Sequence, residues 1–247
     1  MPKTKEKKEK PILPNTRIID LALYFEEERI LVIADLHLGY EEALNKQGVL
    51  VPRFNFNETK QRLKKIFEKT GKVQKVIILG DLKHEFGRIS EQEWNEVILT
   101  IELIAKNCNE IILLRGNHDT ILGPIASWKN LSVREFYYLP EKNLLFIHGN
   151  EMKFFKEFNE SEILVIGHEH PSVTLTEGVK QEKFKCFLKG RWSGKVLVVL
   201  PSFNSFSEGT DVTKEKLLSP FLQQGLEEFE AWAIEDKPYY FGKLKEL

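Results

Sequence analysis

Short apolar runs separated by polar stretches recur along the chain, and in the first half they predict buried β-strands. The runs 76–79 and 111–114 contain no polar position. Such strands are typical of a parallel sheet that is covered on both faces. Two further strands, joined by the acidic turn 25–28, are expected near the start. The four strands predicted in this half are 17–23, 29–35, 76–79 and 111–114.

Two segments between these strands have the pattern of helices. Apolar residues recur at helical spacing in 57–69. Ser90 and Glu93 form a capping box, which predicts a helix from there to about Lys106. The order strand, helix, strand, helix, strand implies parallel pairing through right-handed crossovers.

After Pro124 the pattern changes to strands in quick succession. Most connections are too short to hold a helix, so we expect antiparallel pairing. A helix is predicted over 214–226, and the aromatic-rich end of the chain is expected to pack back on the core. The strands predicted in this half are 133–139, 144–148, 163–166, 183–188 and 195–200.

Together these elements predict an α/β fold, namely a four-layer α/β/β/α sandwich of two mixed sheets flanked by helices. No linker rich in Gly and Ser divides the chain. We therefore expect a disordered charged tail over 1–14 and a single domain over 15–247.

Composition narrows the class of protein. The chain has 247 residues, is 42% hydrophobic and carries a net charge of −1, so it can form a full core but has no general basic field for nucleic acid. Basic residues alternate with apolar ones along 183–195, which indicates either a strip that faces DNA or a solvated sheet edge. The two cysteines, far apart in sequence, favour reduced thiols in a cytoplasmic protein. No apolar stretch reaches the roughly 20 residues of a membrane helix.

The histidines indicate where the chemistry is. All six lie at the ends of apolar runs. Because ligands gather at the carboxyl ends of strands in open α/β sheets, this pattern predicts one polynuclear metal site. Each D-x-H or H-x-H pair is expected to point to one side of an extended segment. The expected division is Asp35, His37 and His170 for one ion, Asn117, His148 and His168 for the other, and Asp81 as the bridge.

Two residues beside a ligand have the chemistry of an acid and its partner. His118 follows Asn117 and is not needed as a ligand, so it is the candidate general acid. Asp119 is expected to fix the tautomer of His118, as carboxylates near metal sites do.

Five motifs, in this order, resemble those of the calcineurin-like metallophosphoesterases. The motifs are DLH (35–37), GD (80–81), GNHD (116–119), HG (148–149) and GHEH (167–170). The resemblance implies the four-layer sandwich, phosphoester hydrolysis and a dinuclear site often filled by manganese, iron or zinc. Carried over position by position, it implies the same seven metal ligands and places the catalytic histidine of the family at His118.

One motif distinguishes branches of this family. The phosphoprotein-phosphatase branch usually has GDxxDR with a phosphate-binding arginine, whereas this chain has GDLKHE over 80–85. A histidine three residues after the bridging aspartate, here His84, resembles the SbcD-type DNA nucleases, where it assists catalysis on a diester. The segments DLHLGYE and VLPSFNSFSEG are similar to small SbcD-related phosphoesterases, some of which accompany DNA-repair ligases or helicases.

The expected function is therefore a phosphodiesterase or nuclease that depends on two divalent ions. A hydroxide that bridges the ions is expected to attack phosphorus, with His118, Asp119 and His84 assisting. Manganese is the expected metal, although iron and zinc also suit mixed nitrogen and oxygen ligands. DNA or a nucleotide is the expected substrate, and a repair helicase or ligase is an expected partner. Two alternatives stay open: a phosphomonoesterase or nucleotide pyrophosphatase acting on a small metabolite, and a non-catalytic metal-binding scaffold.

Overall fold

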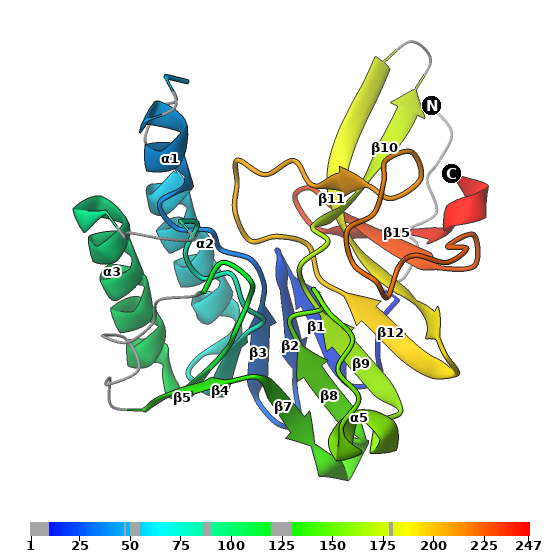
Figure 1. The fold of residues 1–247 in the computed structure, drawn as a ribbon, viewed down its shortest axis with the longest axis horizontal. Coiled ribbons are helices and arrows are strands. Elements are labelled where there is room, and N and C mark those ends of the chain that lie inside the picture. The colour runs from blue at the N-terminus through cyan, green and yellow to red at the C-terminus, as the bar shows by residue number, and fades with distance from the viewer. Residues whose placement is uncertain (1–9, 47, 50–54, 86–89, 120–129, 178–179) are drawn as a thin grey trace.

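Two β-sheets pack face to face, with helices on the outer side of the first sheet (Figure 1). This computed structural model describes residues 10–247 except 47, 50–54, 86–89, 120–129 and 178–179. The predicted α/β sandwich of two mixed sheets is confirmed. Within the described residues, no helix is both long and apolar enough to cross a membrane.

The strand order of the first sheet follows the sequence. Pairing is parallel from β3 to β5, as predicted, parallel also between β5 and β6, where antiparallel pairing was expected, and antiparallel from β1 to β3. The predicted strand 17–23 is wrong, because the chain turns at Asp20, which has a φ of 56°, and forms two strands. The strands are β1 (Thr16–Ile19), β2 (Ala22–Phe25), β3 (Ile30–Ile33), β4 (Val73–Ile78), β5 (Cys108–Leu114) and β6 (Leu131–Arg134).

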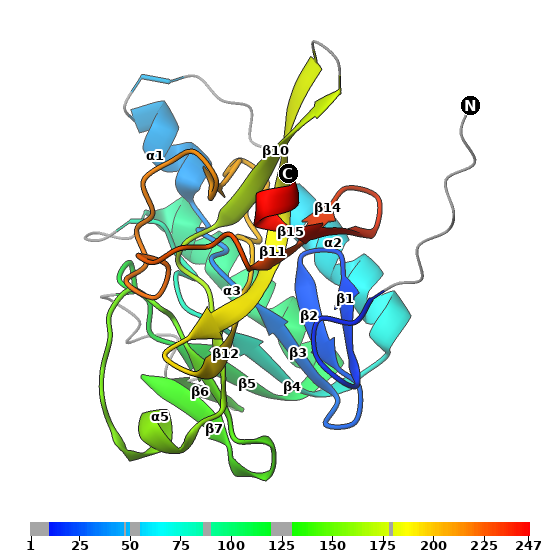
Figure 2. The ribbon, with the colours of Figure 1, turned by 90° about the vertical axis from the view of Figure 1, so that its right-hand side faces the viewer.

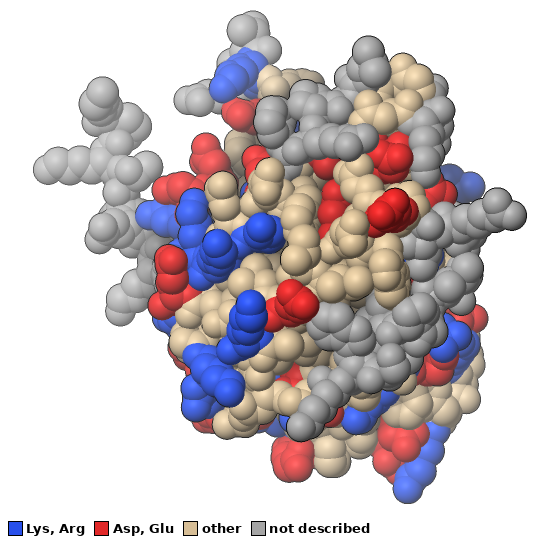
Figure 3. Space-filling model, turned by 90° about the vertical axis from the view of Figure 1, so that its left-hand side faces the viewer, with Lys and Arg blue, Asp and Glu red and all other residues tan. Residues whose placement is uncertain are grey.

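Helices α1 (Tyr40–Lys46), α2 (Asn55–Thr70) and α3 (Glu91–Asn107) lie on the outer side of this sheet (Figure 1). The capping box of α3 is confirmed: the Ser90 hydroxyl accepts a hydrogen bond from Glu93 N, and the Glu93 carboxylate accepts one from Ser90 N. Basic and acidic side chains both occur on this side of the molecule (Figure 3). The helical side is therefore not a uniformly basic surface for nucleic acid.

The second sheet mixes parallel and antiparallel pairs. The expected antiparallel pairing holds for β7 with β8 and for β10 to β12, but β9 lies parallel to both β8 and β12. The hairpin of β10 and β11 projects beyond the rest of the chain (Figure 2). The strands are β7 (Phe136–Leu139), β8 (Leu144–Ile147), β9 (Ile163–Ile166), β10 (Pro171–Glu177), β11 (Lys180–Trp192), β12 (Lys195–Val199), β13 (Thr210–Asp211), β14 (Glu230–Ile234) and β15 (Pro238–Lys243).

Two predicted elements of the second half are wrong. The expected strand 133–139 is split between β6 in the first sheet and β7 in the second, so the chain crosses between the sheets at this point. The expected helix 214–226 is absent from this fully described segment, which consists of turns and bends. Pro220 disfavours helical backbone at the residue before it, and Gly225 weakens any helix. The segment is fixed by burial of its apolar residues Phe221, Leu222 and Leu226.

Side chains of the second sheet alternate between two hydrophobic cores. Phe146 and Val165 pack between the sheets, where the Phe146 ring lies 5.7 Å from that of Phe25. Leu145 and Leu164 point to the outer core, which the short helix α5 (Lys156–Glu160) helps to cover through Phe158. The second sheet is therefore covered on both faces. This arrangement completes the sandwich.

Both ends of the described chain pack on the second sheet. The Trp232 indole donates a hydrogen bond to Lys10 O at 2.8 Å, and the Trp232 ring lies 5.0 Å from that of Tyr240. The aromatic end thus packs back on the core, as expected. Of the predicted tail, residues 1–9 lie outside the described residues, whereas Ile12 and Leu13 are buried in the core. The tail therefore joins the packed structure before residue 14.

The basic residues of β11 do not form a free strip. Lys183 pairs with Glu215 at 2.7 Å, and Lys185 turns inward to donate a hydrogen bond to Ser202 O at 2.8 Å. These contacts weaken the DNA-facing interpretation of this strand. Cys108 and Cys186 are buried and free, in agreement with the prediction of reduced thiols.

Candidate metal centre

The carboxyl ends of five strands bring all the predicted ligands to one place between the sheets. Each ligand lies within four residues of a strand end: β3, β4, β5, β8 and β9 supply them in turn. Among the described residues, three groups of side chains have ligand atoms that lie within 4.8 Å of one another. One of them joins His37 to His84 and His118, and the other two consist of predicted ligands alone. One group is Asp35, His37 and His170, and the other is Asp81, His148 and His168. These two groups contain six of the seven predicted ligands, and the second has Asp81 where the expected division has Asn117.

Asp81 lies between the two groups. Its Oδ2 is 3.4 Å from His148 Nε2 and 3.7 Å from His37 Nε2, which belong to different groups. Asn117 joins the second group, since its Oδ1 lies 2.9 Å from His148 Nε2. The Asp81 carboxylate therefore faces nitrogens of both groups.

Three imidazoles present Nε2 to the centre of the site and use Nδ1 elsewhere. His148 Nδ1 donates to Leu79 O at 2.6 Å, so Nε2 is the nitrogen that can bind an ion once it has lost its proton. His170 Nδ1 lies 3.2 Å from Ser207 Oγ, and His37 Nδ1 lies 3.4 Å from His84 Nδ1. Hydrogen bonds of this kind fix the tautomer of metal-binding histidines.

A buried carboxylate oxygen also fits a cation. Asp35 Oδ1 is buried without a hydrogen-bond partner. It lies 3.6 Å from His170 Nε2 and 3.7 Å from His148 Nδ1. A buried unpaired charge is costly unless a cation or donors compensate it. A divalent ion bound by this oxygen and by the neighbouring imidazole nitrogens would remove that cost, so the residues here fit a divalent metal ion.

Electrostatics keeps two of the ligand imidazoles, His37 and His168, neutral, which is the form that binds metal. Burial and neighbouring histidines lower the pKa of His37 to about 3 and that of His168 to about 4. His148 differs: burial lowers its pKa, but the hydrogen bond to Asp81 and the charge of Asp35 outweigh burial and raise it to about 9. Metal binding must therefore displace a proton from His148 at neutral pH.

The ligand segments are not extended, contrary to the expectation for the D-x-H and H-x-H pairs. Strands β3 and β9 end before the motifs begin. Five ligands then have left-handed φ values: Asp35 (52°), His37 (43°), Asp81 (48°), His168 (67°) and His170 (52°). The sequence pattern showed which residues meet, but not this backbone, because the sharp turns depend on contacts between the sheets.

The glycines of the GD and GNHD motifs are required for two different reasons. Gly80 has a φ of 91°, so it permits a tight turn before Asp81. Gly116 has no such φ. It is required because a Cβ there would collide with the Asp81 carboxylate.

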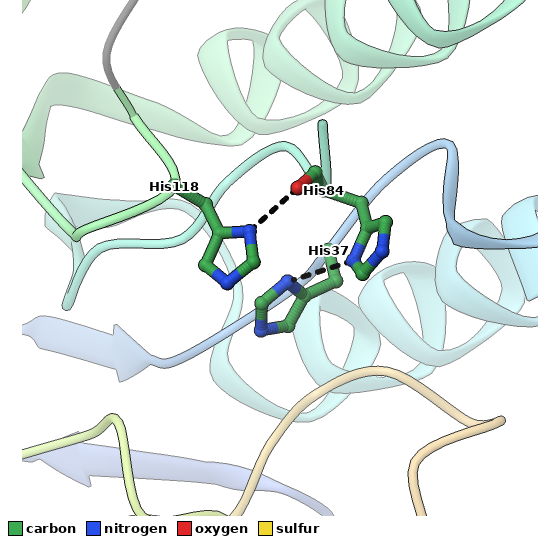
Figure 4. A group of neighbouring side chains, drawn as sticks. All are labelled: His37, His84 and His118. Carbon is green, nitrogen blue, oxygen red and sulfur yellow. Dashed lines mark hydrogen bonds between the residues drawn. The ribbon is translucent and has the colours of Figure 1, made fainter. Parts of the chain in front are cut away.

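His84 and His118 lie side by side next to His37 (Figure 4). Their rings are stacked with centroids 5.4 Å apart, and the His118 ring lies 4.8 Å from that of His37. His118 Nδ1 is 2.5 Å from His84 O and donates to it, and this hydrogen bond fixes the orientation of the ring. Burial and His118 lower the pKa of His84 to about 4, so His84 is neutral.

Asp119 has a different role from the one expected. Its carboxylate accepts hydrogen bonds from Leu82 N at 3.1 Å and Gly116 N at 3.0 Å. The hydrogen bond expected between Asp119 and His118 Nδ1 is made by the His84 carbonyl instead. Asp119 is fully buried, and its hydrogen bond to Gly116 N holds the segment that carries Asn117 and His118.

Two buried residues that the sequence pattern did not single out hold the backbone of His84 and His118. Lys83 is fully buried and donates to His118 O at 2.6 Å. The Glu93 carboxylate accepts hydrogen bonds from His84 N and Glu85 N, both at 3.0 Å. The signals were present, because Lys83 lies between two candidate site residues and Glu93 belongs to the capping box. Their function depends on a contact between α3 and the loop after β4, which the local pattern does not show.

The chain is similar to a family of known proteins and to several solved structures. The family model described as calcineurin-like phosphoesterase matches residues 28–218. A search of curated proteins finds no match. Among solved structures, nuclease MPE of Pseudomonas putida is 21% identical with a TM-score of 0.63, over 91% of this chain and 93% of that one. Vps29 of Entamoeba histolytica in complex with Zn²⁺ is 14% identical with a TM-score of 0.37, over 86% of this chain and 97% of that one.

The first of these likenesses supports the fold, and the family match covers more than half of the chain, including every candidate ligand. This chain therefore belongs to the calcineurin-like phosphoesterase family.

Proposed function

We propose that this protein is a phosphodiesterase, and specifically a nuclease, that works with two divalent metal ions. The observation that carries the proposal is the pair of ligand groups with Asp81 between them, together with the two histidines beside them. Manganese is the proposed metal, and iron and zinc fit the same nitrogen and oxygen donors. When bound, the two ions supply an activated water and positive charge for the phosphoryl oxygens.

Seven side chains are proposed to hold the ions. Asp81 would serve both, because its carboxylate faces nitrogens of both groups. The first ion would be held by Asp35, His37 and His170, and the second by Asn117, His148 and His168.

His118 is proposed as the general acid. Its Nδ1 proton is committed to the His84 carbonyl, so its Nε2 is the atom that exchanges a proton with the leaving oxygen. Lys83 and Asp81 fix the backbone of His118 from both sides, through His118 O at 2.6 Å and His118 N at 2.8 Å. A general acid fixed in this way acts without a large rearrangement.

His84 is proposed to donate a hydrogen bond to the scissile phosphate. An ion bound at His37 Nε2, which faces His170 Nε2 and Asp81, would leave the proton of His37 on Nδ1, 3.4 Å from His84 Nδ1, to which it would be donated. His84 therefore carries its own proton on Nε2 and offers it to a substrate. A neutral donor suits the single negative charge of a phosphodiester, whereas a monoester dianion is better held by an arginine fork.

The likeness to a nuclease supports nucleic acid as the substrate. A repair helicase or ligase as partner stays a prediction from the sequence resemblance. The test is hydrolysis of bis(4-nitrophenyl) phosphate and 4-nitrophenyl phosphate by the Mn²⁺-loaded protein, followed by a DNA oligonucleotide. We expect turnover of the diester and of DNA to exceed that of the monoester. A variant with Asp81→Asn, purified in the same way, controls for contaminating phosphatases.

Two outcomes would contradict the proposal. Faster turnover of the monoester than of the diester would indicate a phosphomonoesterase. Absence of turnover for all three substrates, with two ions bound, would indicate a scaffold.

A further inference from the structure

The loop formed by residues 202–207 contacts every member of one ligand group, either at its backbone carbonyl or at its side chain. Ser202 Oγ donates to Asp35 O at 2.8 Å. Asn204 Nδ2 donates to Leu36 O and His37 O, both at 3.2 Å. Ser207 Oγ lies 3.2 Å from His170 Nδ1. The positioning loop, residues 202–207, therefore reaches Asp35, His37 and His170, which are the proposed ligands of the first ion.

The side chain of Asn204 can adopt only one orientation in this loop. Its Oδ1 accepts a hydrogen bond from Phe206 N at 2.8 Å, so the amide nitrogen must face the two carbonyls. Ser202 and Asn204 are each 1% exposed, and Asn204 N donates to Ser202 Oγ at 3.2 Å. The side chains of Ser202 and Asn204 thus form a connected hydrogen-bond network, in which each donates to the ligand segment and accepts from the loop backbone.

The segment that this network holds needs external support. Asp35 and His37 both have left-handed backbone, with φ values of 52° and 43°. This conformation is unfavourable for residues other than glycine and persists only where surrounding contacts fix it. The three consecutive carbonyls of Asp35, Leu36 and His37 all accept hydrogen bonds from the loop.

Lys185 supports the loop from behind. Its ammonium group donates to Ser202 O at 2.8 Å and also to Asn204 O. The lysine therefore joins the two loop residues whose side chains hold the ligand segment. This contact explains why Lys185 turns inward although it lies in the basic stretch of β11.

The second ligand group is held by other parts of the chain. His148 Nδ1 donates to Leu79 O at 2.6 Å, and Asp81 Oδ1 accepts from His118 N at 2.8 Å. Both partners belong to loops of the first sheet. Within the described residues, the side-chain hydrogen bonds from the loop to candidate ligands all go to the first group.

We propose that the positioning loop sets the affinity of the first ion separately from that of the second, with Asn204 as its principal positioning residue. The inference rests on the proposed function, since it assumes that both groups bind divalent ions. Loss of groups that orient metal ligands typically costs about 10–100-fold in metal affinity. The two ions of the wild-type protein should therefore respond unequally to a change in the loop.

The test is calorimetric titration of metal-free protein with Mn²⁺. Asn204→Asp keeps the shape and the acceptor of the side chain but removes both donors, and Asn204→Ala removes the whole group. Either variant should bind one ion with wild-type affinity and the other about 10–100-fold more weakly. Excess Mn²⁺ should restore kcat for the diester with KM unchanged, a result that a general packing defect would not give.

A matched control is available on the other side of the site. Ser219 is also fully buried, and its Oγ donates to Gly149 O at 2.8 Å, next to His148. Ser219→Ala should leave the affinity of the first ion unchanged. If Asn204 variants fail to fold, Ser207→Ala removes only the partner of His170 at a partly exposed position and should weaken the same ion.

Several results would overturn the inference. Wild-type affinity for both ions in the Asn204 variants would do so, as would equal weakening of both ions or loss of the first ion in Ser219→Ala. Failure of the proposed function is distinguishable, because it would appear as a wild-type protein that binds two ions without hydrolysing a diester. A wild-type protein that binds fewer than two ions would contradict both proposals.

Discussion

Replacing Asp81 with asparagine should destabilise the metal-free protein at pH 6 but have a much smaller effect above pH 9. Burial lowers the pKa of His148, yet the Asp81 hydrogen bond and the Asp35 charge raise it from 6.5 to about 9. One pKa unit corresponds to about 1.4 kcal/mol, so the charged His148 contributes on the order of 3 kcal/mol to folding, shared between the two carboxylates.

The sign follows from proton linkage. A pKa that is raised in the folded state stabilises the fold below the unfolded value of 6.5, and this contribution is lost as the pH rises through about 9. The Asp81→Asn amide removes the charge, so the difference between variant and wild type should be largest at pH 6. Titrating groups that the charge of Asp81 does not influence are the same in both proteins and cancel in the difference.

The assay is urea unfolding of both proteins in chelator at pH 6, 7.5 and 9.5. Asp236→Asn, which removes an exposed carboxylate, is the control and should show no such trend. Equal destabilisation by Asp81→Asn at all three pH values would refute the reasoning. With metal present, the same variant should bind both ions more weakly, and metal analysis showing two ions at wild-type affinity would contradict the bridging role.

Three further predictions concern catalysis and metal. His118→Ala should keep both ions but lower kcat by roughly 10²–10⁴, as loss of a general acid does; a wild-type rate in a stopped assay would disprove the assignment. His84→Ala should reduce turnover of diesters with metal content intact, and metal analysis beside the rate measurement separates this from ligand loss. Chelation should lower Tm by about 5–10 °C relative to protein with metal at 100 times Kd, reversibly on adding Mn²⁺. An unchanged Tm would argue against metal binding by the folded state.

The local pattern was sufficient for the elements that carry the site. The runs before Asp35, Asp81 and Asn117 predicted parallel strands, and their shared sheet edge predicted that the ligands meet. The capping box at Ser90 gave the start of α3 correctly because it depends only on neighbouring residues.

The errors have a common physical origin in contacts between distant segments. The run 133–139 looks like one strand, but its first part pairs in the first sheet and its second part in the second sheet, and the two parts separate at Glu135. The tautomer partner of His118 was expected to be its neighbour Asp119, whereas the nearby carbonyl of His84 comes from another loop. The hydrogen bond from Asn204 Nδ2 to His37 O joins residues that are 167 positions apart, and neither local sequence indicates it.

The left-handed backbone at five of the ligands has a consequence for attempts to change the metal preference of the site. Among residues other than glycine, Asp, Asn and His adopt this conformation several-fold more often than average. All five positions are Asp or His. An engineer who introduces Glu or Cys at Asp35 or His168 would alter the donor atom and also strain the turn. Redesign of this centre is therefore restricted to a small set of residue types by geometry, before any question of metal chemistry arises.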